Sequence, residues 1–86
     1  MTLEQLRKRI DRVDRKILVL LNERASVARR VGGLKRRQDL PIFDGKRESS
    51  ILRRIARSNG GPLSSAAVRE IFQAILRHNR RLQGKG

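Results

Sequence analysis

Apolar residues recur along positions 3–34 at steps that alternate between three and four residues. This is the heptad pattern of a long helix that packs along its length against another helix. Thr2 followed by Gln5 predicts a capping box at the start of this helix. A helix over 3–36 is about 50 Å long, so it needs a partner of similar length. The seam consists of Leu3, Leu6, Ile10, Val13, Ile17, Leu20, Arg24, Val27, Val31 and Leu34.

The next part of the chain predicts a loop and a second helix. The glycine pair at 32–33 lies inside the first helical pattern and costs roughly 1 kcal/mol per glycine relative to Ala, so it could kink or end that helix. Pro41 predicts a short loop over 39–43. Asp44 can then cap a helix that reaches about Arg57.

The segment 58–62, Ser-Asn-Gly-Gly-Pro, is a strong helix stop. Ser64 or Ser65 can cap a third helix that reaches about Gln83. Its apolar face is formed by Val68, Ile71, Phe72, Ile75 and Leu76. The sequence therefore predicts one all-α domain over residues 1–86, with three helices that are long, short and medium.

Composition limits the classes of function. The chain has 86 residues and a formal net charge of +14, with 22 Lys and Arg against 8 Asp and Glu. Such a charge suits polyanions. The basic residues are spread along the chain, however, and the two aromatic residues, Phe43 and Phe72, offer little for stacking bases, so nucleic acid is an unfavoured partner. An acidic protein partner is an alternative use of the charge.

Small size and missing residue types narrow the choice further. A chain this short buries only about 60% of its unfolded surface, so a second copy is expected. Cysteine is absent and His78 is the sole histidine, so we expect no metal. The longest strictly apolar run, 17–21, is far too short to span a membrane, and we expect a cytoplasmic protein.

Cations interrupt the apolar seam of the first helix. An unpaired buried guanidinium is costly, so Arg24 either pairs with an acid such as Asp14 or Glu23 of a neighbouring helix or meets an anionic ligand. Lys35 lies on the same face about 16 Å further along. Arg7 borders the seam too far from Lys35 to share a pocket within one chain, but it could share one across a dimer.

Polar residues also enter the apolar faces of the later helices. Glu48, with Arg47 beside it and Asp44 one turn earlier, places a carboxylate on the second helix. Asn79 and Gln83 continue the apolar face of the third helix, although a helix end often turns polar only because it meets water. His78 is more readily read as a packed or surface residue than as an acid or base. Cations, one carboxylate and two amides suit a small compound with more than one carboxylate.

The chain resembles the all-helical chorismate mutases. The resemblance rests on six separated polar positions within segments that follow the family's order. These segments are 6–14 (LRKRIDRVD), 20–24 (LLNER), Val31-Gly32 and Lys35, 44–48 (DGKRE), and Ile71-Phe72 through Asn79 to Gln83. The turn at 59–63 also looks like that of mutase domains fused to prephenate dehydratase, but no second catalytic domain is expected because the chain stops after Gln83. The family often has Ser where this chain has Asn79.

The resemblance implies an intertwined homodimer with shared active sites, and the rearrangement of chorismate to prephenate in aromatic amino-acid biosynthesis. This pericyclic reaction needs no cofactor, and catalysis rests on conformer selection and electrostatic stabilisation. The resemblance also implies a role for each site residue. Arg24 and the partner's Arg7 would bind the two carboxylates, and Lys35 and Gln83 would donate to the ether oxygen. Glu48, aided by Asp44 and Arg47, would accept from the ring hydroxyl, and Asn79 would also face the substrate.

Three alternatives stay open at this point. Two are relatives on the same scaffold, an isochorismate pyruvate lyase and a mutase of amino-substituted chorismate. Glu48 favours the hydroxyl-bearing chorismate, because the pyruvate lyase relatives lack an acid at this position, whereas an amino-substituted substrate can be separated only by assay. The third is a basic helical module that binds nucleic acid, whose affinity would depend strongly on salt.

Overall fold

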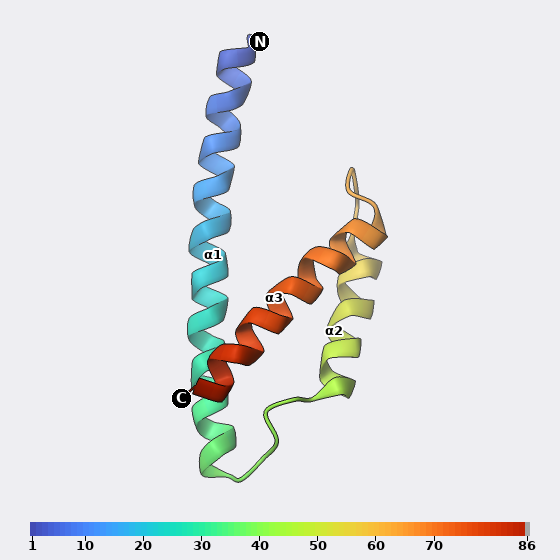
Figure 1. Ribbon diagram of the computed structural model, residues 1–86. Coiled ribbons are helices and arrows are strands. Elements are labelled where there is room, and N and C mark those ends of the chain that lie inside the picture. Colours follow the sequence, from blue (N-terminus) through green and yellow to red (C-terminus); the bar gives the residue numbers. More distant parts are fainter. Residues whose placement is uncertain (86) are drawn as a thin grey trace.

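A computed structural model describes residues 1–85, the last of them by its backbone only. It contains three helices, α1 (Leu3–Arg37), α2 (Gly45–Ser58) and α3 (Ser65–Lys85), and no strand within these residues (Figure 1). The helix α1 is a long rod, α3 crosses its C-terminal half obliquely, and α2 packs against α3. The result is an elongated all-α chain of 55 × 24 × 15 Å, as the sequence predicts.

Each helix begins at a cap that the sequence encodes. The capping box at Thr2 is formed, because the Gln5 amide donates to the Thr2 hydroxyl at 3.1 Å and the Gln5 side chain accepts from the Thr2 amide at 2.9 Å. Asp44 accepts from the Arg47 amide at 3.0 Å, and Ser64 accepts from an amide one turn into α3, also at 3.0 Å. These caps satisfy amides that a helix start leaves without partners.

The glycine pair neither kinks nor ends α1, which runs on to Arg37. Gly32 is buried where α3 crosses α1. A Cβ at this position would lie 2.6 Å from Cα and 2.7 Å from the carbonyl oxygen of Gln83. The two helices therefore approach closely at Gly32, and its missing side chain allows the crossing.

The core within one chain is small. The buried apolar residues are Ala28 of α1, Ile51 of α2 and Leu76 of α3. The apolar seam of α1 stays largely exposed, with Ile10 at 58% and Leu20 at 62% of their full accessibility. The N-terminal part of the seam has no covering element within residues 1–85, whereas its members Arg24 and Val31 lie on the side of α1 that faces α2 and α3. No described helix has both the length and the apolar character that a membrane span requires.

Candidate active site

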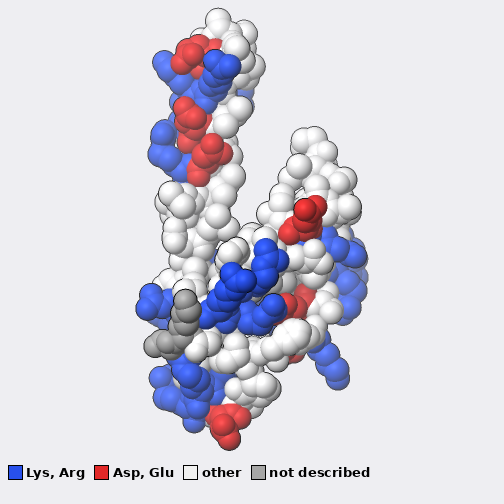
Figure 2. All heavy atoms as spheres, in the orientation of Figure 1, with Lys and Arg blue, Asp and Glu red and all other residues white. Residues whose placement is uncertain are grey.

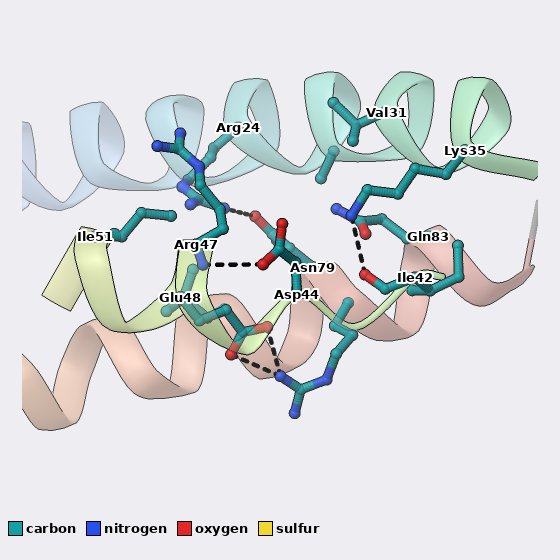
Figure 3. A pocket seen from close by; sticks show the side chains of 13 residues that line it. Arg24, Val31, Lys35, Ile42, Asp44, Arg47, Glu48, Ile51, Asn79 and Gln83 are labelled. Atoms are coloured by element: carbon teal, nitrogen blue, oxygen red, sulfur yellow. Dashed lines mark hydrogen bonds and ion pairs between the residues drawn. The ribbon is translucent and has the colours of Figure 1, made fainter. Parts of the chain in front are cut away.

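A cavity of about 160 Å³ lies where the three helices approach one another (Figure 3). Its walls come from the C-terminal half of α1, the loop before α2, the first turns of α2, and the C-terminal half of α3. The lining residues are Arg24, Ala28, Val31, Lys35, Ile42, Asp44, Arg47, Glu48, Ile51, Leu76, Asn79, Arg80 and Gln83. Every site residue predicted from the sequence except Arg7 therefore lines one cavity.

Arg24 is half-buried and donates a hydrogen bond to the side-chain oxygen of Asn79. Burial lowers the pKa of Arg24, the nearby charge of Arg47 lowers it further, and Glu48 partly opposes the change. The partner of the guanidinium is thus a neutral amide, and neither Asp14 nor Glu23 pairs with it in the described chain. An amide orients the cation without neutralising it, so the charge of Arg24 is retained for a ligand.

Lys35 reaches the other end of the cavity. Its ammonium group donates to the carbonyl oxygen of Ile42 at 3.0 Å, which ties the loop before α2 to α1. An ammonium has three donors, so two remain for another acceptor. Figure 3 shows this group beside the side chain of Gln83.

Gln83 is half-buried and lines the cavity, so it is more than a helix end that has turned polar on meeting water. Its position is fixed from two directions. Its backbone packs against Gly32, and its carbonyl oxygen accepts a hydrogen bond from Arg36. Asn79, one turn earlier, is 7% exposed and is the one buried polar side chain of the described residues. The Asn79 amide is therefore held by burial and by its bond to Arg24, and the backbone of Gln83 is held at the helix crossing.

The polar residues at the start of α2 have other partners than the sequence predicts. Asp44 lines the cavity while its carboxylate caps α2. We expected Arg47 to support Glu48, but the carboxylate of Glu48 is bound by Arg80, whose Nη1 donates to Oε1 at 2.7 Å and to Oε2 at 2.6 Å. Arg47 instead places its charge beside Arg24.

Arg80 is the site residue that the sequence reasoning missed. A signal for it existed, because Arg80 follows Leu76 by four residues and so continues the apolar face of α3. Asn79 and Gln83 continue this face as well, at spacings of three and seven residues from Leu76.

Two other candidates lie outside the cavity. Arg7 is exposed, about 26 Å along α1 from Arg24, and does not line the cavity. His78 is exposed and borders an apolar groove between α1 and α3. The structure therefore leaves Arg7 without a role inside one chain.

The cavity carries an excess of positive charge. Arg24, Lys35, Arg47 and Arg80 face two carboxylates, those of Asp44 and Glu48, so the formal balance is two positive charges. Figure 2 shows Lys and Arg side chains gathered where α3 crosses α1, while the middle of α1 is nearly free of charged atoms. This arrangement suits a small molecule with two negative charges that offers donors or acceptors to the two amides.

Comparison with known proteins places the chain among enzymes. Residues 6–84 match the family model described as chorismate mutase type II. The chain is 38% identical over 82 residues to the chorismate mutase of Methanocaldococcus jannaschii, covering 94% of this chain and 83% of that protein. It is 44% identical over 78 residues to the bifunctional chorismate mutase/prephenate dehydratase of Aquifex aeolicus, covering 86% of this chain but 22% of that protein. The chain thus spans about a fifth of the length of the bifunctional relative.

Solved structures agree with the sequence comparison. Form II of the chorismate mutase of Thermus thermophilus superposes with a TM-score of 0.94 at 35% identity, covering 95% of this chain and 93% of that one. The chorismate mutase of Helicobacter pylori in complex with prephenate gives 0.87 at 29% identity, covering 96% and 90%. On the match over residues 6–84 and these likenesses, the chain belongs to the chorismate mutase type II family.

Proposed function

We propose that this chain catalyses the rearrangement of chorismate to prephenate, a step in the biosynthesis of phenylalanine and tyrosine. The observation that carries the proposal is the cavity with two excess positive charges beside the amides of Asn79 and Gln83. Chorismate is a small dianion with two carboxylates, an ether oxygen and a ring hydroxyl, and each of these groups has a complementary side chain in the cavity.

The cationic groups bind the dianion. Arg24, oriented by Asn79, is placed to bind one carboxylate. Arg24 is half-buried beside the exposed Arg47. The cost of holding its charge there falls when an anion enters, because the anion offsets the repulsion between the two guanidinium groups and the loss of solvent around Arg24. Binding of a dianion is therefore more favourable here than binding of a neutral compound.

Lys35 and Gln83 perform the chemical step. The reaction breaks an ether bond while a carbon–carbon bond forms, and negative charge develops on the ether oxygen. Lys35 on α1 and Gln83 on α3 reach the same end of the cavity and can donate to that oxygen (Figure 3). Because the donors are held in place beforehand, they stabilise the transition state without reorganising, and the cavity walls select the compact substrate conformer.

Glu48 recognises the ring hydroxyl. Its carboxylate lies in the cavity wall formed by α2 and α3 and can accept a hydrogen bond while it stays paired with Arg80, because a carboxylate has about four acceptor positions. The same carboxylate could accept from the amino group of the substituted relative, so assays must separate these two substrates.

The active form is a homodimer in which the partner's Arg7 completes each site. Two observations support this proposal. The apolar seam of α1 is exposed along its length, which is costly for an isolated chain. Arg7 borders this seam, far from the cavity of its own chain, so pairing of the long helices can bring it to the cavity of the other copy.

The activity is tested with purified protein and chorismate, by following the loss of chorismate and the formation of prephenate. Arg24→Ala should lower kcat/KM about 100-fold or more, because a preorganised donor stabilises the transition state by about 3 kcal/mol. Arg29→Ala on the same helix is the matched control, since Arg29 is exposed and outside the cavity. A folded wild-type dimer that leaves chorismate unchanged refutes the function, and parallel assays with isochorismate and amino-substituted chorismate test the two relatives.

A further inference from the structure

Arg80 joins two elements that the proposed reaction uses, but it has no task of its own in that reaction. Its guanidinium binds both carboxylate oxygens of Glu48, forming the one ion pair within residues 1–85. The same guanidinium lies over the ring of Phe43, 4.9 Å from the ring centre. Arg80 thus connects α3 to the start of α2 and to the loop before it. A cation between a carboxylate and an aromatic face is restrained on two sides.

The pair of Glu48 and Arg80 forms a wall between two hollows. On one side is the cavity that holds Arg24, and on the other is an open groove bordered by Phe43 and Arg77. Figure 3 shows the carboxylate of Glu48 turned away from the guanidinium groups of Arg24 and Arg47, and it is bound on that side by Arg80. Its place at the wall therefore depends on the partner that it finds there.

Without that partner, Glu48 has other cations to turn to. Arg24 and Arg47 lie on the cavity side of the same wall, and the charge of Glu48 already acts on Arg24. A carboxylate released at this place would move toward those guanidinium groups. It would then neutralise cations that the substrate carboxylates need, and it would leave the position from which it meets the ring hydroxyl.

We propose that Arg80 is a positioning residue that holds Glu48 at the wall between α2 and α3, so that Glu48 accepts from the substrate hydroxyl and the cations of the cavity stay available for the dianion. The proposal rests on the proposed function for the identity of the substrate. Its physical basis is the geometry of the ion pair and of the Phe43 contact.

The inference predicts a change mainly in KM. Contacts to the hydroxyl and to the carboxylates are made in the ground state and in the transition state alike, so weakening them raises KM more than it lowers kcat. Arg80→Met keeps the apolar stem and should raise KM about tenfold, because a charged hydrogen-bonded contact is lost, with kcat within about threefold of wild type. Arg80→Lys keeps the charge and should recover part of the loss.

A double-mutant cycle separates this role from a general effect on folding. In the Glu48→Gln background the released side chain is neutral, so Arg80→Met should change KM by less than about twofold. Arg81→Met is the control, because Arg81 is an exposed neighbour on the same helix and lies outside the cavity. Helix content and the unfolding midpoint of each variant are measured alongside.

Binding of prephenate by calorimetry gives a readout that does not need turnover, and the same variants should show the same order of Kd values. The proposal is wrong if Arg80→Met behaves like Arg81→Met. It is also wrong if Arg80→Met raises KM and Kd as much in the Glu48→Gln background as in the wild-type background. If the wild type binds prephenate with this dependence on Arg80 but leaves chorismate unchanged, the positioning role stands and the proposed reaction fails. If the wild type does neither, both fail.

Discussion

Replacing Gly32 by Ala tests the crossing of α1 and α3, and the same replacement at the neighbouring Gly33 is the control. In Gly32→Ala the new Cβ would meet Cα, the carbonyl oxygen and Cβ of Gln83 at 2.6, 2.7 and 2.8 Å. Carbon atoms in ordinary contact lie about 3.5–4.0 Å apart, so the helices must separate by about 1 Å. The obstructing atoms include backbone, which cannot turn aside as the end of a flexible side chain can.

Two opposing effects determine how Gly32→Ala changes the free energy of unfolding. Overpacking costs about 1–3 kcal/mol, and a clash with backbone belongs at the upper end of that range. Replacing Gly by Ala within a helix gains about 1 kcal/mol. Gly32→Ala should therefore lower the stability by about 1–2 kcal/mol. Gly33→Ala meets nothing closer than 3.7 Å, at the flexible end of Arg36, and should raise the stability by about 1 kcal/mol.

Urea unfolding followed by circular dichroism measures this difference, at one fixed protein concentration because association adds to the apparent stability. The activity of the variant adds a second measure. Displacing Gln83 by about 1 Å should lower kcat up to about 100-fold in Gly32→Ala but not in Gly33→Ala. Equal stability of the two variants, or full activity of Gly32→Ala, would refute the account of the helix crossing.

Two further predictions concern Arg24. Arg7→Ala and Arg24→Ala should each be nearly inactive. When equal amounts of the two are mixed and their subunits exchange, half of the dimers contain one copy of each variant and have one intact site, so about one quarter of the wild-type activity should return. No recovery would contradict the shared site. Arg24→Lys should lose activity at alkaline pH where the wild type is unaffected. Burial and the charge of Arg47 lower the pKa of Arg24, and they would also lower the pKa of a lysine at this position below its ordinary value of about 10.4, so that the lysine becomes neutral as the pH rises. The pH profiles of kcat/KM for the two proteins measure this, and identical alkaline limbs would contradict it.

The arginine excess has a consequence for these assays. Positive charge around the cavity attracts a dianion over a distance, so kcat/KM depends on ionic strength even where the chemical step does not. Variants that remove one arginine are therefore compared at the same salt concentration. The exposed control residues Arg29 and Arg81 account for this long-range part, since each loses one charge without entering the cavity.

The sequence determined the elements and most of the candidate site. The sequence predicts that Thr2, Asp44 and either Ser64 or Ser65 begin helices. Thr2, Asp44 and Ser64 do so, because a cap depends only on residues three or four positions away, but the choice of Ser64 comes from the structure. Helical periodicity likewise placed Arg24 and Lys35 on one face of α1 and Asn79 with Gln83 on one face of α3. Residues that share a helix face keep that relation however the helices are packed.

Only the tertiary structure decided which faces meet and which atoms touch. The pairing of Arg80 with Glu48, the amide partner of Arg24 and the contact of Gly32 with Gln83 all join residues that lie far apart in the sequence. Each depends on where one helix crosses another and how closely, and this is set by the packing of many side chains at once. Gly32 reads in the sequence as a weak point of α1, and in the fold it is the position at which α3 can come close enough to place Gln83.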